Sequence, residues 1–364
     1  MGLTDPLLPW VLGVAALLLF LIVIIFWSRF ARSGVLWVLL RITSLVTLNI
    51  LVISTIGVAA NNYGGFYTSW RELLGQKEKP PLIVTRDDVN ITKIDIQKSK
   101  RKLDGSVVLR RLVRGVTSGI TAEVYISLPP SYVKSVELGE KVDENYPIIM
   151  FLPGYPGHAA AWLNGMQIVE RETRLKQEGK IPEVISILPE INVSGKFDAE
   201  CMNVDGGPQV ESWLANDVVT FTSNWLSLKP HSWRVVGYST GGWCATMLAL
   251  RHPTQFAVAA SIAGYYKPQP AKQLSVAEKI RLENEYDLYS TISRQKSNIA
   301  LLVINPIGDK NSHLATSEFL KKVKPPIRTS EIILEGAGHN FTTWRKVIDS
   351  VITWTATEQI AAIS

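Results

Sequence analysis

The sequence predicts an α/β fold with a mainly parallel central sheet flanked by helices, and two patterns support this. The first is a series of short, almost continuously apolar runs, typical of strands that are buried on both faces. The second is the alternation of these runs with helical segments, as at 209–226 and 315–323, over a chain of 364 residues. The apolar runs are 147–152, 184–188, 233–236, 257–262, 299–304 and 331–334.

A different pattern precedes this region. From Leu82 to Tyr132 apolar and polar residues alternate, clearly so at 91–96 and 122–128. A period of two indicates antiparallel strands with one buried face. We therefore expect antiparallel strands on the N-terminal side of the parallel sheet. The polar stretch 265–297 is longer than a simple connection, and we interpret it as a helical cap insertion, with a plain surface insertion as the alternative.

Two uncharged apolar runs, 10–27 and 42–60, lie near the N-terminus. At about 1.5 Å per residue each is long enough to cross a hydrocarbon core of ~30 Å. The first run resembles a signal-peptide core only in part, since no basic residue precedes it and no small-residue cleavage site follows. The sequence therefore predicts a transmembrane hairpin within 1–60, a linker at 61–81 and a soluble domain at 82–364.

Charges around the apolar runs bear on membrane orientation. Two spans place both chain ends on the same side. Arg29 and Arg32 in the short connector favour a cytoplasmic connector and an extracytoplasmic domain at the plasma membrane. Arg71, Lys77 and Lys79 follow the second span and weaken that argument.

A glycine-rich turn, Gly237 to Gly242, lies between the apolar run 233–236 and an apolar helical segment, and it carries Ser239. A strand, a tight turn with a serine and a helix together form the pattern of a nucleophile elbow. Backbone N–H groups at the helix start favour a developing oxyanion. Because serine is a weak nucleophile unless a base takes its proton, we expect a histidine and a carboxylate further along the chain.

Candidates for both partners follow later apolar runs. Asp309 follows 299–304, and His339 follows 331–334 through a glycine-containing turn. Open α/β sheets place their chemistry in such loops, and the order Ser, Asp, His suits a nucleophile elbow. Asp287 and Glu335 remain weaker alternatives for the acid.

The other four histidines are weaker candidates for the base. His252 is predicted to end the helix after Ser239, and His231 and His313 are predicted at the surface, His313 in a loop that leads into a helix. His158 is the strongest alternative, because it lies in the loop after 147–152.

Stabilising an oxyanion requires two N–H donors at fixed positions. The backbone N–H of Thr240 directly follows the candidate nucleophile, and Tyr155 in the Pro/Gly-rich loop 151–157 is the candidate for the second donor. An ordinary turn is the alternative for that loop.

Composition excludes several classes of protein. Two cysteines, Cys201 and Cys244, rule out a disulfide-dense scaffold and a four-cysteine metal site. An oxidising compartment would favour a Cys201–Cys244 disulfide, which we predict, with two buried free thiols as the alternative. The net charge is +6, but zinc-knuckle spacing, an RNP-type strand motif and a basic recognition helix are all missing from the sequence, so we expect no nucleic-acid partner.

Residues from about 82 to 364 resemble the esterase D/antigen 85-type branch of the α/β-hydrolases. The resemblance is carried by the segments 128–132, 152–154, 237–242 and 338–344. It implies an α/β-hydrolase fold with Ser239 as nucleophile and His339 as base, and no metal or organic cofactor. Mycolyltransferase members use a glutamate as the acid, so Asp309 is closer to the hydrolase pattern. The apolar pair is not part of that fold; the combination resembles membrane-tethered esterase-like proteins of actinobacteria.

These observations favour a membrane-anchored serine esterase that hydrolyses lipid or cell-envelope esters through an acyl-enzyme. Two alternatives remain open: an acyltransferase that moves acyl groups between envelope lipids or sugars, and a non-catalytic binding or scaffolding module. The oligomeric state is not predicted by any of these features.

Overall fold

In a computed structural model the chain divides into two compact units, Met1–Lys79 and Pro80–Ser364. The structure describes residues 2–30, 33–64, 67, 70–74, 91–97, 99, 101–195, 197–228 and 233–359. Much of the predicted linker 61–81 and the start of the alternating region at 82–90 lie outside the described residues.

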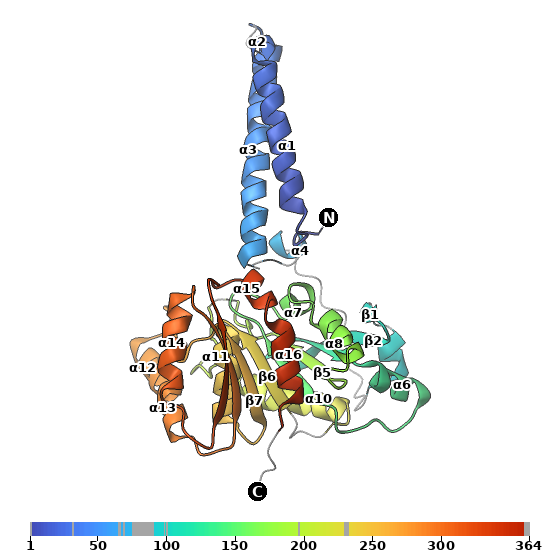
Figure 1. Ribbon diagram of the computed structural model, residues 1–364, viewed down its shortest axis with the longest axis vertical. Helices are drawn as coiled ribbons and strands as arrows, with labels where there is room; N and C mark the ends of the chain where they lie inside the picture. The colour runs from blue at the N-terminus through green and yellow to red at the C-terminus, as the bar shows by residue number, and fades with distance from the viewer. Residues whose placement is uncertain are drawn as a thin grey trace. The chain divides into compact units, whose positions relative to one another are not determined.

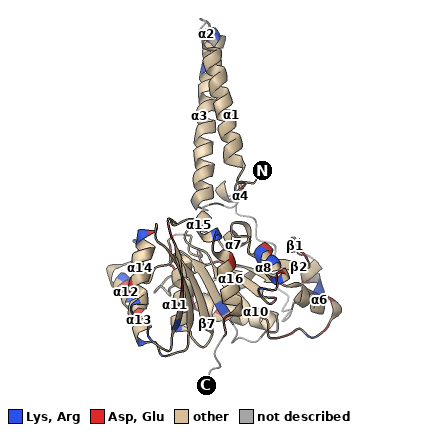
Figure 2. Ribbon diagram, viewed as in Figure 1, with Lys and Arg blue, Asp and Glu red and all other residues tan. Residues whose placement is uncertain are grey.

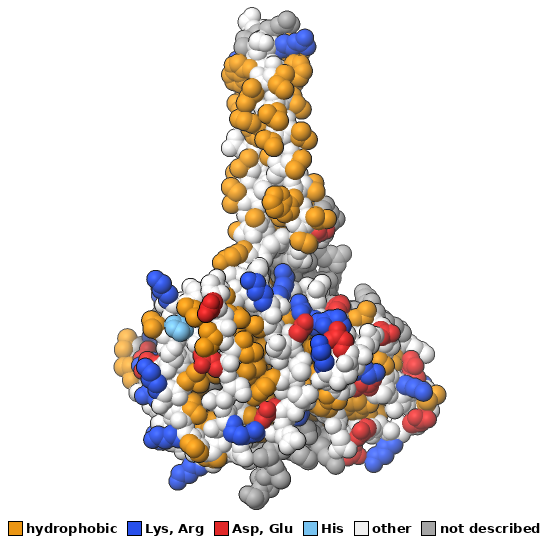
Figure 3. Space-filling view, viewed as in Figure 1, with side chains coloured by type: hydrophobic (Ala, Val, Ile, Leu, Met, Phe, Trp, Pro, Cys, Tyr) orange, Lys and Arg blue, Asp and Glu red, His pale blue; other side chains and the backbone are white. Residues whose placement is uncertain are grey.

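The first unit is a pair of long helices, α1 (Leu8–Ile25) and α3 (Val35–Gly64), which lie side by side (Figure 1). Both are long and apolar enough to cross a membrane, with mean hydropathies of 2.9 and 2.1. Lys and Arg are confined to the connecting end of the pair (Figure 2), and hydrophobic side chains are exposed along it (Figure 3). Short helices α2 (Trp27–Phe30) and α4 (Trp70–Leu73) follow the two long ones.

Packing and polar groups in this pair suit an apolar environment. A Cβ on Gly13 of α1 would lie 3.6 Å from the methyl carbon of Thr55 in α3, so the helices approach closely there. The hydroxyl of Thr55 and the side-chain amide of Asn49 donate to carbonyl oxygens four residues earlier. These polar side chains are therefore satisfied within their own helix. The predicted helices at 10–27 and 42–60 are both present, and the second is longer at both ends.

The second unit is built on a sheet of nine strands among the described residues, in the order β1-β2-β3-β5-β4-β6-β7-β8-β9. Neighbouring strands pair antiparallel from β1 through β2 and β3 to β5. The remaining neighbours, from β5 through β4 and β6 to β9, all pair parallel. This arrangement confirms the predicted parallel sheet with antiparallel N-terminal strands. The strands are β1 (Arg101–Leu103), β2 (Ser106–Arg114), β3 (Thr121–Leu128), β4 (Ile148–Leu152), β5 (Ile185–Pro189), β6 (Trp233–Tyr238), β7 (Phe256–Ile262), β8 (Ala300–Pro306) and β9 (Arg328–Leu334).

Helices cover both faces of the sheet and enclose two hydrophobic cores. Along β4, Met150 and Leu152 enter one core while Ile149 and Phe151 enter the other, as the alternation of side chains in a strand requires. Helix α16 crosses the front of the sheet in Figure 1. One face carries α6 (Pro130–Leu138), α9 (Val210–Ser212), the π-helix η1 (Trp213–Val218), α10 (Val219–Trp225), α11 (Thr240–Arg251) and α14 (Lys310–Leu320); the other carries α7 (Ala160–Asn164), α8 (Ile168–Gln177), α15 (Phe341–Arg345) and α16 (Ile348–Thr357).

The prediction of a strand at 91–96 is wrong, because this segment contains the short helix α5 (Lys93–Gln97). The Asp95 carboxylate accepts from the N–H and the hydroxyl of Thr92, at 2.9 and 2.8 Å, and the Thr92 hydroxyl accepts from the Asp95 N–H at 3.4 Å. Reciprocal capping of this kind starts a helix and outweighs the alternating pattern.

The helix predicted at 315–323 begins five residues earlier, at Lys310. Asp309 is its N-cap, since the carboxylate oxygen Oδ1 accepts from the Ser312 N–H at 3.3 Å. His313 therefore lies in α14 and not in a loop. It is half-buried, and its Nδ1 lies 2.9 Å from Oδ1 of Asn305.

The stretch 265–297 contains two helices, α12 (Val276–Glu285) and α13 (Leu288–Arg294). The buried Glu211 ties them to the core: it accepts from the Tyr286 hydroxyl at 2.6 Å and from Arg251 Nε at 2.7 Å. Burial raises the pKa of Glu211, but hydrogen bonds from His252, Arg251 and Tyr286 lower it to about 2. The stretch is thus a fixed part of the domain; its role as a cap stays a prediction.

Candidate active site

Ser239 lies in a strained turn between β6 and α11. Its φ of 54° and ψ of −123° are rare for a residue with a side chain. A Cβ on Gly237 would lie 1.9 Å from the carbonyl oxygen of Gly241, so only glycine fits at that position. This close approach forces the turn that projects Ser239 from the sheet edge.

Three side chains from different strand ends form one hydrogen-bonded chain. Oγ of Ser239 lies 2.8 Å from Nε2 of His339, and Nδ1 of His339 lies 2.6 Å from Oδ2 of Asp309. These residues follow β6, β9 and β8, whose carboxyl ends lie at the same edge of the sheet. The structure thus brings together the three residues that the sequence singled out.

Electrostatics favour an ionised Asp309. Burial raises the pKa of this carboxyl, but the hydrogen bond and charge of His339, with the amide of Ser312, hold it below its usual value. An ionised Asp309 accepts the proton on Nδ1 of His339, which leaves Nε2 free to accept from the Ser239 hydroxyl. The chain of contacts is therefore arranged to withdraw a proton from serine.

Aromatic packing fixes the imidazole ring. The ring of His339 lies edge-on to Trp344, with 5.1 Å between centroids, and Trp344 stacks on Tyr238 at 4.7 Å. The side chain of Asn340 caps α15 by accepting from the Thr343 N–H at 3.0 Å. Packing thereby holds the ring of His339, and the Asn340 cap holds the backbone next to it.

Two backbone amides next to Ser239 are available as donors. A Cβ on Gly154 would lie 3.0 Å from Cβ of Ser239, so the loop after β4 lies against the serine. Within the part of the chain that the structure describes, neither the N–H of Tyr155 nor that of Thr240 donates to a protein acceptor. Their role in holding an oxyanion remains a prediction.

The sequence is similar to known proteins. Residues 117–349 match the model of the esterase family, described as "Putative esterase". The chain belongs to this family. It is also 22% identical over 258 residues to an uncharacterized protein of Corynebacterium glutamicum, a match that covers 66% of this chain. The match spans only 58% of the length of that relative.

Solved structures show the same fold at low sequence identity. An S-formylglutathione hydrolase from Agrobacterium tumefaciens is 14% identical with a TM-score of 0.57, covering 70% of this chain and 96% of that one. MPT51 of Mycobacterium tuberculosis is 12% identical with a TM-score of 0.52, covering 68% and 97%. The second unit of this esterase-family chain therefore has the α/β-hydrolase fold.

The predicted disulfide is present and joins Cys201 to Cys244. Both cysteines are fully buried, and because they are bonded to each other the alternative of two free thiols is wrong. Cys244 lies in α11, one turn after Ser239, and Cys201 lies in the long connection after β5. The bond therefore fastens this connection to the helix that begins directly after Ser239.

Sequence reasoning missed a buried carboxyl group beside this disulfide. Glu200 accepts from the Tyr265 hydroxyl and, at 2.9 Å, from the N–H of Gln269. The Tyr265 hydroxyl also lies 3.4 Å from Oγ1 of Thr240. Burial raises the pKa of Glu200 to about 7 despite these hydrogen bonds. Its position next to Cys201 was the one signal in the sequence that could have found it.

Competing candidates contact other partners. Nδ1 of His158 lies 3.1 Å from the carboxylate of Glu190, and His252 ends α11 as predicted, with Nε2 2.8 Å from Glu211. Asp287 caps α13 by accepting from the Tyr289 N–H. Glu335 is exposed in the turn before His339, and His231 lies outside the described residues.

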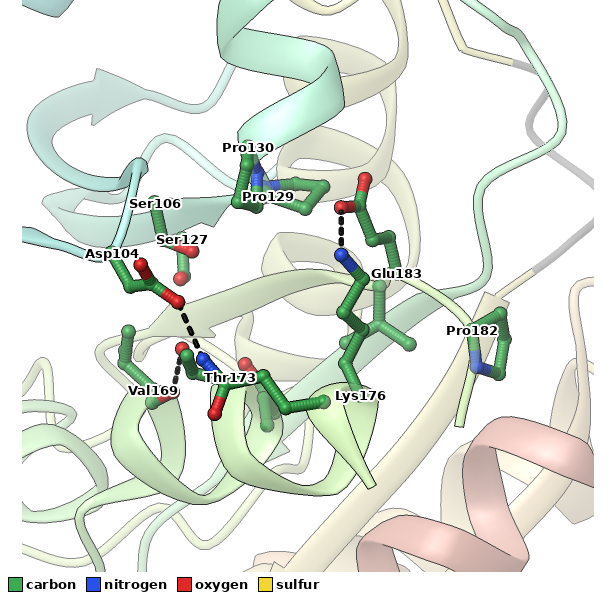
Figure 4. A pocket seen from close by; sticks show the side chains of 13 residues that line it. Asp104, Ser106, Ser127, Pro129, Pro130, Val169, Thr173, Lys176, Pro182 and Glu183 are labelled. Atoms are coloured by element: carbon green, nitrogen blue, oxygen red, sulfur yellow. Dashed lines mark hydrogen bonds and ion pairs between the residues drawn. The ribbon is translucent and has the colours of Figure 1, made fainter. Parts of the chain in front are cut away.

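Figure 4 shows a cavity of about 50 Å³ whose lining includes none of Ser239, His339 and Asp309. Its lining includes Lys176, which pairs with Glu183 at 3.1 Å, and Asp104, which accepts from Gln177 at 2.6 Å. Residues 182–184 of this lining precede β5, whereas Ser239 follows β6, so the cavity lies at the opposite edge of the sheet. Among the described residues, we find no group of three or more acidic, His or Cys side chains placed to hold a metal ion.

Proposed function

We propose that this protein is a membrane-anchored serine esterase that hydrolyses carboxylic esters through an acyl-enzyme on Ser239. The observation that carries the proposal is the unbroken hydrogen-bonded chain from Ser239 through His339 to Asp309. The strained turn positions Ser239, and the hydrogen bond with Asp309 orients the imidazole of His339.

In the acylation step, Oγ of Ser239 attacks the ester carbonyl carbon while Nε2 of His339 takes the hydroxyl proton. The carbonyl oxygen becomes an oxyanion, which the N–H groups of Thr240 and Tyr155 stabilise. As the tetrahedral intermediate collapses, His339 gives its proton to the leaving alkoxide and the alcohol departs. Asp309 stabilises the imidazolium throughout without being protonated.

In the deacylation step, water attacks the acyl carbon and gives a proton to Nε2 of His339. Collapse of the second intermediate returns that proton to Ser239 and releases the carboxylic acid. In each half-reaction His339 accepts one proton and then donates it, so both His339 and Ser239 return to their starting states.

Substrate and location are proposed from the rest of the chain. The apolar helices α1 and α3 would anchor the enzyme to a membrane, which favours esters of lipids or of the cell envelope. A disulfide is typical of an oxidising compartment, and with Arg29 and Arg32 in the connector it favours an extracytoplasmic catalytic domain.

Activity-based labelling tests the nucleophile. Wild-type protein in detergent should react with a fluorophosphonate probe and hydrolyse a p-nitrophenyl ester, and Ser239→Ala should lose both. Ser293→Ala, at an exposed position in α13, is the matched control and should keep both. Undiminished labelling of Ser239→Ala, or no labelling of the wild type, would refute the proposal.

A second experiment tests substrate and orientation. Acyl chains from acetyl to palmitoyl, presented in mixed micelles, should show increasing kcat/KM if the natural substrate is a lipid. Product analysis with an added sugar or lipid alcohol distinguishes free acid from a transferred ester. Protease added to intact cells should digest the catalytic domain; full protection would place the domain on the cytoplasmic side.

A further inference from the structure

One asparagine outside the triad holds the loop that carries Tyr155. Nδ2 of Asn192 donates to the carbonyl oxygen of Gly154 at 3.3 Å and also to that of Gly157. Its Oδ1 is buried and has no hydrogen-bond partner among the described residues. The side-chain amide of Asn192 therefore donates hydrogen bonds to two carbonyl oxygens of this loop, which lie three residues apart in the sequence.

Peptide geometry links this contact to the proposed oxyanion hole. The cis peptide bonds in the described part of the chain are Tyr155–Pro156 and Pro325–Pro326, so the bond between Gly154 and Tyr155 is trans. In a trans peptide the C=O and the N–H point in opposite directions. Because the Gly154 carbonyl points toward Asn192, the N–H of Tyr155 points away from it.

Ser239 lies against the Gly154 end of that peptide. A Cβ on Gly154 would meet Cβ of Ser239 at 3.0 Å and the ring of Tyr238 at 3.1 Å. The N–H of Tyr155 also donates to no acceptor among the described residues, as expected of a group reserved for a ligand.

We propose that Asn192 is a positioning residue that aims the Tyr155 N–H at the oxyanion of the tetrahedral intermediate. The inference rests on the proposed esterase function and deepens it. Asn192 does not touch the reacting atoms; it acts through the Gly154–Tyr155 peptide. Preorganised donors stabilise a transition state because they need no reorientation when the charge develops.

The neighbouring Glu190 makes this support rigid. Its Oε1 accepts from the N–H of Asn192 at 3.0 Å, and its Oε2 accepts from the N–H of Ala159, at the far end of the same loop, at 3.3 Å. The backbone carbonyl of Glu190 accepts from the indole N–H of Trp213 at 2.9 Å. The end of β5 thus clamps the loop after β4 at both ends, and a fixed supporting shell is what a precise donor requires.

Two substitutions test the proposal. Asn192→Ala removes the donor, and Asn192→Asp keeps the size but places carboxylate oxygens against two carbonyls. We expect both to lower kcat about 10- to 100-fold with little change in KM, since loss of a whole oxyanion donor costs about 100- to 1,000-fold. The inhibition constant of an alkyl boronic acid, whose adduct mimics the tetrahedral oxyanion, should weaken by a similar factor.

Controls separate positioning from folding. In Asn192→Ala, the pH at which activity is half lost on the acid side should not move, because this substitution adds no charge and leaves the His339–Asp309 pair intact. Asn145→Ala, in a loop where the amide contacts Asp143, should keep wild-type kinetics. If Asn192→Ala lowers the melting temperature strongly, kinetics of folded Asn192→Asp decide the question.

The possible outcomes are distinct. A kcat within threefold of wild type in the folded Asn192 variants overturns the proposal, as does a rise in KM with unchanged kcat and unchanged boronic acid inhibition. Wild-type protein that neither turns over esters nor reacts with a fluorophosphonate refutes the esterase function itself.

Discussion

A Cβ on Gly241 would lie 2.1 Å from the carbonyl oxygen of Leu152, so helix α11 and the end of β4 meet at the backbone. This contact joins the turn of Ser239 to the strand that leads into the loop of Tyr155. The turn of Ser239 and the loop of Tyr155 can lie this close together because residue 241 has no side chain.

Gly241→Ala should therefore disrupt the domain. The added methyl would overlap backbone atoms that belong to the sheet and cannot shift, so we expect a loss of stability of at least about 3 kcal/mol, or failure to fold. Thermal unfolding and the yield of soluble protein measure this. A Cβ on Gly206 would meet no atom within 4 Å. Gly206→Ala should therefore lower the stability by only about 1–2 kcal/mol, because of its positive φ of 65°. Equal stabilities for the two variants would contradict the contact.

Asp309→Asn should separate catalysis from stability. An asparagine still caps α14, so the melting temperature should change little. It lacks the negative charge that stabilises the imidazolium of His339, so kcat should fall about 100- to 10,000-fold. Asp287→Asn, at the N-cap of α13, is the matched control with normal kcat. A kcat for Asp309→Asn within fivefold of wild type would remove Asp309 from the mechanism.

Removal of the disulfide should destabilise the catalytic domain. The bond joins residues 43 positions apart, and the loop-entropy relation gives about 4 kcal/mol for a loop of that length. We expect the double variant Cys201→Ala, Cys244→Ala to unfold at a clearly lower urea concentration than the wild type. A reductant should lower the wild-type midpoint and leave that of the double variant unchanged. Identical midpoints without reductant would contradict this expectation.

Glu172 should make stability depend on pH. Burial raises the pKa of this carboxyl from 4.5 to about 8, although the Ser186 hydroxyl donates to it at 2.5 Å. A raised pKa in the folded state means that the folded protein binds the proton more tightly than the unfolded chain does. The stabilisation is therefore complete below pH 4.5 and is lost as the pH rises toward 8.

Glu172→Gln removes this titration and keeps a hydrogen-bonding group. As the pH rises between these two values, the free energy of unfolding of the variant should increase relative to that of the wild type by at most about 1.4 kcal/mol per pH unit. Urea unfolding at pH 5, 6.5 and 8 measures the difference. Glu137→Gln, on the exposed side of α6, should show no such trend. A stability difference for Glu172→Gln that is constant with pH would show that Glu172 does not titrate in this range.

Local patterns in the sequence predicted much of the fold. The apolar runs identified β4 to β8 because a strand covered on both faces has no polar side to interrupt the run. A similar run identified the edge strand β9, although its residues are exposed or half-buried. The nucleophile turn was recognisable because its glycines are required by contacts within a few residues, as between Gly237 and Gly241. Ser239, Asp309 and His339 could be selected because each follows a strand end.

Two helix starts were predicted wrongly because the apolar pattern does not include capping side chains. The reciprocal hydrogen bonds of Thr92 and Asp95 form a helix where the alternation of side chains predicted a strand. Asp309 starts α14 earlier than expected, and this places His313 in a helix. In both cases polar side chains accept hydrogen bonds from backbone N–H groups at the start of a helix, which an apolar pattern cannot predict.

The sequence by itself determined the strands, the serine turn and the residues able to supply a nucleophile, a base and an acid, because these depend on neighbours in the chain. Only the tertiary structure decided which distant groups meet. The strand order places β5 beside β4, and this brings Asn192 and Glu190 to the loop of Tyr155. It also places Tyr265 next to Thr240 and Glu200 next to Tyr265. Strand order follows from the packing of the whole domain, which no local pattern records.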